Sequence, residues 1–326
     1  MMRPWRTALW LLVTIALACS ASQSRLAGGG QNDAAWREFR SPHFVLRTDT
    51  NREEARESLV DFETTYETLR AILFAGDPGG ASPVHVVLFA HGADLRRFIP
   101  PGTIAAFVPA LQDDPESEPT MLLETSFSDE ARRIFLHEIT HAFIGRTFSH
   151  IPLWLNEGLA KYFETMRIEP GRVVVGNPIQ EFDIAANQMP SLSALLDADA
   201  AKFYAGRVEH SVEGLYQQSS YYAAAWYLVH MLLHGKAEYR GRFHDFLDAL
   251  KRREPAARAW ARAFDEAMLQ RLAMDYLEYL RTDSLDAGFV TVDARDTEKT
   301  TAMERVMPAD EVRRLWDRLR RTAARP

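Results

Sequence analysis

We begin with residues 135–141, which read Phe-Leu-His-Glu-Ile-Thr-His and contain the motif H-E-x-x-H. On a helix, His137 and His141 stand one turn apart on the same face, so both imidazoles can reach one ion. Glu138 lies beside them, where a carboxylate can act as a general base on a water molecule. The motif therefore predicts a helix that carries a zinc site.

Local signals support this helix. Ser128 is a favourable N-cap, and the acidic residues Asp129 and Glu130 suit the positive end of the helix dipole. Gly145 predicts the C-terminal end. Apolar neighbours flank the two histidines, namely Ile134, Phe135, Ile139, Ala142 and Phe143. Such a helix would be largely buried, and a metal would supply the partners that its buried histidines and glutamate need.

A second stretch follows at residues 151–164, which read Ile-Pro-Leu-Trp-Leu-Asn-Glu-Gly-Leu-Ala-Lys-Tyr-Phe-Glu. Pro152 suits a helix start. Gly158 and Ala160 leave room for this helix to pack closely against the motif helix, while Glu157 projects across the gap. The two stretches together predict a site of two histidines and one glutamate with an open fourth position.

The pair HEITH and WLNEGLAKYFE resembles the gluzincin clan of metallopeptidases, and especially its peptidase MA-like families. The string W-L-N-E-G-x-A is similar to the one that follows H-E-x-x-H in the aminopeptidase branch, where its glutamate is the third zinc ligand. The resemblance implies that role for Glu157. Only residues 142–156 separate His141 from Glu157, a shorter spacer than in that branch, and no G-x-M-E-N string precedes the motif. A metallopeptidase is therefore implied, but not an aminopeptidase.

Two other residues compete with Glu157 as the third ligand. His150 suggests the metzincin pattern H-E-x-x-H-x-x-G-x-x-H, but Gly145 and His150 come one and three residues too late for it. Glu164 falls two turns after Glu157 on the same helix face, and we expect it to orient a ligand or Lys161. Glu157 is the preferred ligand.

A later tyrosine is a candidate for stabilising the oxyanion that forms when an amide is hydrolysed. In the aminopeptidase branch this tyrosine lies in a string Y-x-K-G-A, which resembles Tyr222 with Ala225 three positions on. Tyr222 is the candidate and Tyr221 the alternative, against the competing interpretation that both are core aromatics. His230 and His234 also have metal-ligand spacing, but no glutamate follows the first, so we interpret them as surface or core residues.

The N-terminus predicts export. Residues 1–18 have a basic start at Arg3 and Arg6 and a short apolar run, as in a signal peptide. Cys19, the single cysteine of the chain, follows at once and resembles the lipidated cysteine of a bacterial lipoprotein. Residues 19–33 would then be a flexible tether to a membrane, with the protein in the periplasm or at the cell surface. The alternative is a freely secreted protein.

The remaining chain predicts an α+β fold with an N-terminal mixed sheet, and the order of its elements resembles that of zincins. The resemblance implies a zincin-like (gluzincin) domain over residues 34–235, followed by a helical C-terminal region over 236–326. Strands and one helix should precede the motif helix, at residues 43–48, 52–74 (the helix), 84–89, 105–110 and 121–124. In zincins the strand beside the motif helix is a sheet edge that pairs with substrate, so either Thr120–Thr125 or Ala105–Ala110 is expected at the edge. Later helices are expected at 191–204, 219–234, 239–251, 256–280 and 310–321, the last as a solvated surface helix, and strands at 173–175 and 289–292.

Composition is that of an ordinary globular enzyme, with 47% hydrophobic and 25% charged residues, and a net charge of -7 gives no reason to expect nucleic acid. The leading expectation is an extracytoplasmic metallopeptidase with one Zn²⁺, acting on a peptide or protein substrate. The alternatives are a binding or assembly lipoprotein on a zincin scaffold and a hydrolase of a non-peptide amide. Glu138 argues against the first alternative, because a purely structural zinc site needs no general base.

Overall fold

The computed structural model describes residues 35–73, 82–99, 104–111, 113–125, 128–178, 186–209, 211–282, 285–291 and 302–323. The expected signal peptide, Cys19 and tether lie outside these residues. The described residues divide into two compact units. The first takes its residues from Met1–Glu67, Gly80–Phe135 and Arg295–Pro326, and the second from Thr68–Gly79 and Leu136–Ala294. The expected boundary between residues 235 and 236 falls inside the second unit.

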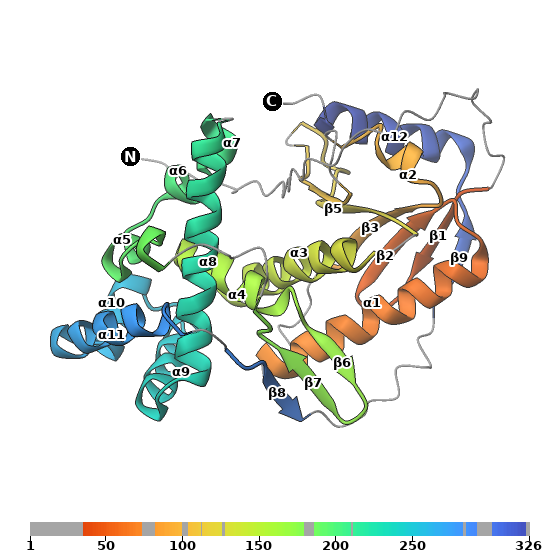
Figure 1. The fold of residues 1–326 in the computed structure, drawn as a ribbon. Coiled ribbons are helices and arrows are strands. Elements are labelled where there is room, and N and C mark those ends of the chain that lie inside the picture. The colour runs from red at the N-terminus through yellow and green to blue at the C-terminus, as the bar shows by residue number, and fades with distance from the viewer. Residues whose placement is uncertain are drawn as a thin grey trace, which may run out of the picture. The chain divides into compact units, whose positions relative to one another are not determined.

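The first unit is built on a six-stranded mixed sheet with the order β4-β5-β3-β2-β1-β9 (Figure 1). Its strands are β1 (Arg37–Arg40), β2 (Phe44–Thr48), β3 (Val84–Phe89), β4 (Ala106–Val108), β5 (Thr120–Glu124) and β9 (Met303–Val306). The central strands β2, β3 and β5 are parallel, and β1, β4 and β9 run antiparallel to their neighbours. The α+β class and the N-terminal mixed sheet are confirmed, whereas the zincin-like character stays a prediction. Strands β1 and β9 are additional to those expected.

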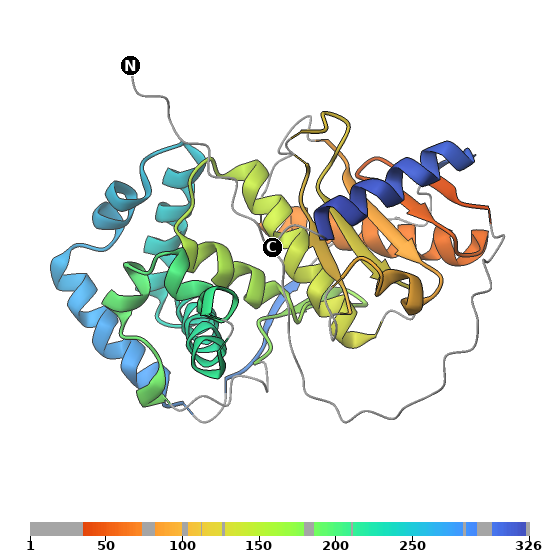
Figure 2. The same ribbon diagram turned by 90° about the horizontal axis from the view of Figure 1, so that it is seen from above.

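Helices cover both faces of this sheet. Helix α1 (Arg52–Leu73) packs its apolar side on one face, where Phe62 lies against Phe44 and stacks on Phe135 at 4.6 Å between ring centroids. The other face carries α2 (Gly92–Leu95) and α12 (Ala309–Ala323), and Figure 2 shows α12, in dark blue, lying across the strands. Leu315 and Leu319 of α12 are buried there. Helix α12 is therefore a surface helix, as expected, and its apolar side packs on the sheet.

The edge of the sheet lies on one of the two expected segments. Strand β4, within Ala105–Ala110, is terminal in the sheet order and pairs only with β5 among the described strands. Strand β5 has partners on both sides, β4 and β3. Thr120–Thr125 as an edge is therefore wrong, since the backbone groups of an inner strand are already used by its neighbours.

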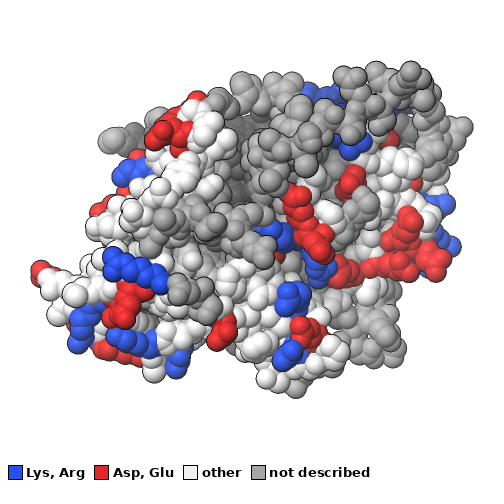
Figure 3. Space-filling view, viewed as in Figure 1, with Lys and Arg blue, Asp and Glu red and all other residues white. Residues whose placement is uncertain are grey.

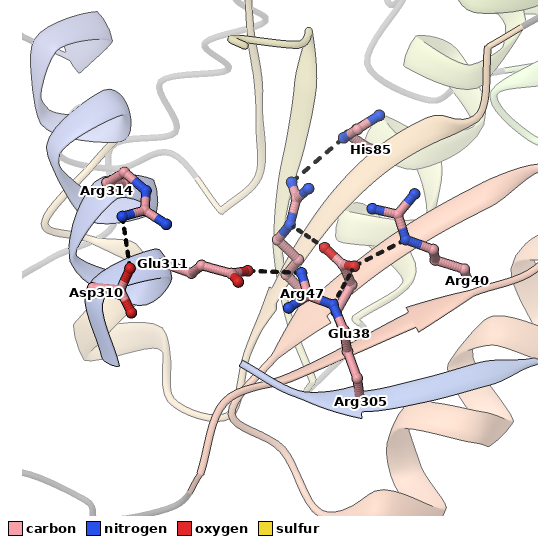
Figure 4. A network of polar contacts seen from close by, with 8 residues as sticks. All are labelled: Glu38, Arg40, Arg47, His85, Arg305, Asp310, Glu311 and Arg314. Atoms are coloured by element: carbon pink, nitrogen blue, oxygen red, sulfur yellow. Dashed lines mark hydrogen bonds and ion pairs between the residues drawn. The ribbon is translucent and has the colours of Figure 1, made fainter. Parts of the chain in front are cut away.

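A buried carboxylate ties the C-terminal strand to the N-terminal ones (Figure 4). Glu38 of β1 accepts hydrogen bonds from Arg40 and Arg47 at 2.9 Å each and from Arg305 of β9 at 3.0 Å. Arg305 also binds Glu311 of α12 at 2.7 Å. Burial raises the pKa of Glu38, but the hydrogen bond from Arg305 and the charge of Arg47 outweigh it and lower that pKa to about 2. The carboxylate is thus ionised and shared by three guanidinium groups.

The second unit is mainly helical, as expected, with a small antiparallel sheet of order β6-β7-β8. Helix α3 (Asp129–Thr147) enters it from the first unit. The other elements are α4 (Leu153–Phe163), β6 (Arg167–Glu169), β7 (Arg172–Val175), η2 (Ala186–Gln188), α5 (Leu192–Leu196), α6 (Ala200–Phe203), α7 (Ala205–Glu209), α8 (Val212–His234), α9 (Ala237–Lys251), α10 (Ala256–Ala263), α11 (Glu266–Tyr279) and β8 (Gly288–Thr291). In Figure 1, α8 is the long helix of this unit, with α9, α10 and α11 near its C-terminal half.

Several helix ends differ from expectation for local reasons. Helix α3 runs past Gly145 to Thr147, because Gly145 lacks the positive φ of a terminating glycine. The expected helix over 256–280 is two helices, since Phe264 is extended and Asp265 caps a new helix by accepting from Met268 N at 2.9 Å. Residues 191–204 likewise form two short helices, α5 and α6, and α8 begins at residue 212 rather than 219.

Helix α4 packs most extensively against α8, and a glycine permits their close approach. A Cβ atom on Gly158 would lie 2.6 Å from the Ala225 carbonyl oxygen and 2.7 Å from Cγ2 of Val229. The room that Gly158 leaves is therefore filled by α8, which corrects the expectation that it serves packing against the motif helix.

Charges on the surface are mixed. On the face seen in Figure 3, the lysines and arginines of the described residues lie in small groups, with acidic side chains near several of them. Within the described ranges, no helix is both long enough and apolar enough to cross a membrane.

Candidate metal centre

Helix α3 presents the two motif histidines to one point. Its first turn is capped as predicted, with Ser128 Oγ accepting from Ala131 N at 3.2 Å. His137 is buried and His141 nearly so, and their Nε2 atoms lie 3.0 Å apart. The one-turn spacing of H-E-x-x-H thus brings two imidazole nitrogens together, as the sequence predicts.

Helix α4 adds Glu157 to this pair. The Glu157 side chain is fully buried, and its Oε2 lies 3.6 Å from Nε2 of His137 and 3.6 Å from Nε2 of His141. The three ligand atoms lie within 4.8 Å of one another and form the one group of this kind found among the described residues. The three predicted ligands are therefore brought together, and the cluster could hold a metal ion.

The outer nitrogens of both histidines face oxygen atoms. Nδ1 of His137 lies 3.2 Å from Glu164 Oε2, and Nδ1 of His141 lies 3.1 Å from Asn156 Oδ1. An oxygen acceptor at Nδ1 favours the tautomer with its proton there, which leaves a lone pair on Nε2. Two nitrogen lone pairs and one carboxylate oxygen then point at the same place. Three acceptors with no donor between them require a cation or a proton.

The spacing of these atoms fits a divalent cation. Ligand bonds of about 2.0–2.2 Å place neighbouring ligand atoms about 3–4 Å apart around one ion, the range of the 3.0 and 3.6 Å separations found here. Glu157 Oε2 is buried and forms no hydrogen bond within the described residues. An ion would give this oxygen the partner that a buried carboxylate needs.

The residues of the cluster shift one another's pKa values. Burial lowers the pKa of His137, but the carboxylates of Glu157 and Glu164 raise it more, and the net shift is upward. Burial raises the pKa of Glu157, but the facing imidazoles of His141 and His137 lower it well below the usual range. A cation would compete with the proton that this upward shift favours on His137.

Glu164 contacts the two kinds of partner expected for it, a ligand histidine and Lys161. Besides its contact with His137, Glu164 Oε2 lies 2.8 Å from Nζ of Lys161, and both side chains are buried. This ion pair with Lys161 limits the movement of the Glu164 carboxylate. The His137 ring is thus held from behind by a paired carboxylate.

Tyr222 lies beside this ion pair. Its ring is 5.6 Å from Nζ of Lys161 and packs against Phe203 at 6.2 Å between centroids. Tyr221 packs against the same phenylalanine at 5.4 Å. Neither tyrosine belongs to the three-residue cluster, and the oxyanion role of Tyr222 stays a prediction.

Glu138 and His150 have different surroundings. Glu138 is buried on α3 and lies between the two ligand histidines in the sequence. It is not a member of the three-residue cluster, which is compatible with a general base that does not bind the metal. His150 is exposed and also outside the cluster, so the rival metzincin-like ligand is excluded.

His230 is a core residue and His234 lies at the surface, in line with the expectation for them. His230 Nδ1 lies 2.7 Å from the Tyr279 hydroxyl, and His234 Nε2 lies 2.6 Å from the Tyr162 hydroxyl. Burial, and the neighbouring charge of His234, lower the pKa of His230 to about 4. These contacts join α8 to α4 and to the end of α11.

Two residues of the site were not expected from the sequence. Asn156 Oδ1 accepts a hydrogen bond from Nδ1 of His141. Its position next to Glu157 in W-L-N-E could have indicated that it lies near the ligands. The Tyr204 hydroxyl donates to Glu157 Oε1 at 2.7 Å. Tyr204 follows α6, far from both motifs in the chain, and no local pattern marks it.

Comparison with known families gives one match. Residues 135–257 match a family described as "Protein of unknown function (DUF1570)". This segment begins at the motif helix and contains all the cluster residues, yet it spans less than half of the chain. Among curated proteins, none matches the sequence. The description states no activity, so the chemistry must be inferred from the site itself.

Proposed function

We propose that this protein is a zinc-dependent metallopeptidase that acts outside the cytoplasm. The observation that carries the proposal is the convergence of two histidine Nε2 atoms and Glu157 Oε2 in a buried cluster, with Glu138 on the same helix turn. A set of two imidazoles and one carboxylate is the donor set of catalytic zinc sites that keep a position open.

The two orienting contacts favour a functional centre over an accidental cluster. Each ligand histidine has an oxygen partner at Nδ1, and such partners fix the ring orientation and strengthen Nε2 as a ligand. When bound, zinc would lower the pKa of a coordinated water and polarise a carbonyl group.

Glu138 is the residue that we expect to move protons. As a carboxylate beside the cluster, it would accept a proton from the attacking water and deliver it to the leaving amine. His137, His141 and Glu157 would bind and orient, with Tyr222 as the candidate donor to the oxyanion. Glu138 distinguishes this proposal from a structural zinc site, which requires ligands alone.

A peptide substrate and an extracytoplasmic location rest on the sequence. The pair of motifs resembles gluzincin peptidases, and the N-terminal residues resemble an exported lipoprotein. The resemblance to these peptidases implies that the amide hydrolysed is a peptide bond. A binding lipoprotein without turnover and a hydrolase of another amide are the outcomes that experiment must separate from this one.

The test combines metal analysis with two variants of the mature domain. The parent should bind about one zinc per chain, and His137→Ala should lose it. Glu138→Gln should keep the zinc and lose peptide hydrolysis by a factor of about 10² or more, because the general base is gone. Zinc retention by Glu138→Gln serves as the internal control for the intact site.

Each outcome has a distinct meaning. A parent that binds no zinc on reconstitution would exclude the metallopeptidase. Equal hydrolysis by the parent and Glu138→Gln would exclude the proposed base, and zinc binding without hydrolysis of any peptide library would favour the binding protein.

A further inference from the structure

The carboxylate of Glu157 has two oxygens with different surroundings. Oε2 faces both histidine Nε2 atoms at 3.6 Å. Oε1 accepts the Tyr204 hydroxyl at 2.7 Å, a short hydrogen bond between buried groups. Oε2 thus faces the two histidines, and Oε1 is held by Tyr204.

This division matters because a carboxylate can bind a cation through one oxygen or through both. The terminal torsion of a glutamate side chain is soft, so an unrestrained carboxylate can turn its second oxygen towards an ion at low cost. In a catalytic zinc site, that oxygen would compete for the position that water or substrate must occupy. Hydrogen bonds to an ionised carboxylate are among the stronger ones in proteins, so a single one can decide between two such orientations.

We propose that Tyr204 is a positioning residue that keeps Glu157 bound to the metal through Oε2 alone. This inference rests on the proposed function, since it requires a metal in the cluster. Tyr204 keeps the fourth position open by occupying Oε1, and it needs no contact with the substrate. A hydroxyl has one proton, and in this arrangement that proton is donated to Glu157 rather than to a reacting oxygen.

The fold gives Tyr204 a fixed place for this task. It follows α6 directly, and its backbone N–H donates to the Ala200 carbonyl, which closes the last turn of that helix. The preceding residue, Phe203, is fully buried against the rings of Tyr221 and Tyr222 of α8. The backbone at Tyr204 is therefore held by the last turn of α6 and by the packing of the preceding residue.

The test replaces zinc with cobalt(II) in the full-length protein and compares Tyr204→Phe with the parent. Cobalt(II) with four ligands absorbs visible light more strongly than with five or six, so the spectrum reports on the coordination of Glu157. The parent should show the strong spectrum of four ligands. Tyr204→Phe should still bind cobalt but show the weaker spectrum, and with zinc its kcat should fall about tenfold or more.

Two further variants sharpen the result. Tyr216→Phe makes the same chemical change at an exposed tyrosine of α8 and should leave the spectrum and kcat unchanged. Tyr204→Gln offers an amide N–H in place of the hydroxyl and should recover part of the strong spectrum. It also provides a second reading at this position if the phenylalanine variant is poorly folded.

The outcomes separate this inference from the proposed function. If the parent binds cobalt and Tyr204→Phe has the parent's spectrum, the positioning role is overturned, even if kcat falls, because the tyrosine must then act elsewhere. If the parent binds no cobalt, both the inference and the metal site are overturned.

Discussion

The contact between α4 and α8 gives a sharp prediction for Gly158→Ala. Helix α4 carries Glu157, and Gly158 is the residue at which it approaches the backbone of α8. We expect Gly158→Ala to destabilise the protein although alanine is the better helix former, because the new methyl group has no space.

The size of the effect follows from two opposing contributions. Alanine in place of glycine in a helix interior is favourable by about 1 kcal/mol. Against this, the added Cβ would lie 2.6 Å from the Ala225 carbonyl oxygen, a backbone atom that cannot rotate away. Such overpacking costs about 1–3 kcal/mol and sometimes more. The net expectation is a loss of up to about 2 kcal/mol in the free energy of unfolding, with a fall in Tm of about 2–4 °C for each kcal/mol.

The measurement is urea unfolding of the metal-free protein, followed by far-UV circular dichroism, with Gly241→Ala as the matched control. Gly241 is an exposed glycine in the interior of α9, and a Cβ there would meet nothing within 4 Å. The control should therefore be more stable than the parent by about 0.5–1 kcal/mol. Opposite signs for the two glycines support the packing explanation. A Gly158→Ala protein as stable as the control would refute it.

Two other outcomes are expected. Glu38 has a folded-state pKa of about 2, below its ordinary 4.5, so its carboxylate stabilises the fold above pH 4.5 and this contribution is lost as the pH falls towards 2. Glu38→Gln should therefore be less stable than the parent at pH 7, by about 1–3 kcal/mol, with a difference that shrinks between pH 4.5 and 2; a constant difference in urea unfolding across this range would contradict the linkage. Asn156→Ala should bind zinc about 10–100-fold more weakly in competition with a chelator, since His141 loses the acceptor at Nδ1, whereas Asn156→Asp keeps an acceptor and should retain affinity. Equal affinities for the alanine variant and the parent would show that Asn156 does not orient the ring.

The grouping of His137, His141 and Glu157 was largely predictable, because the sequence signals for it lie close together in the chain. His137 and His141 lie one turn apart on a helix by their spacing alone, and the apolar residues around them predict burial. Glu157 required the second motif, whose helix start at Pro152 the structure confirms. Glu164 as an orienting residue followed from its position two turns after Glu157.

Sequence patterns misled where the deciding contact was not local. Gly145 is a residue type that often ends a helix, but its φ is not positive and α3 continues to Thr147. Strand β9 has a short, mixed sequence, and its pairing with β1 and the arginine contacts to Glu38 come from residues far along the chain. The sequence of α12 does not show which element its apolar side contacts, and in the structure Leu315 and Leu319 are buried against one face of the sheet.

By itself, the sequence determined the α+β class, the positions of the central strands, the motif helix and the three residues of the cluster, because period, caps and motif spacing are properties of neighbouring residues. Only the tertiary structure decided that Gly158 meets α8, that β9 closes the N-terminal sheet and that Tyr204 holds Glu157 Oε1. These contacts join residues far apart in the chain, where packing and burial choose the partners and no local pattern records the choice.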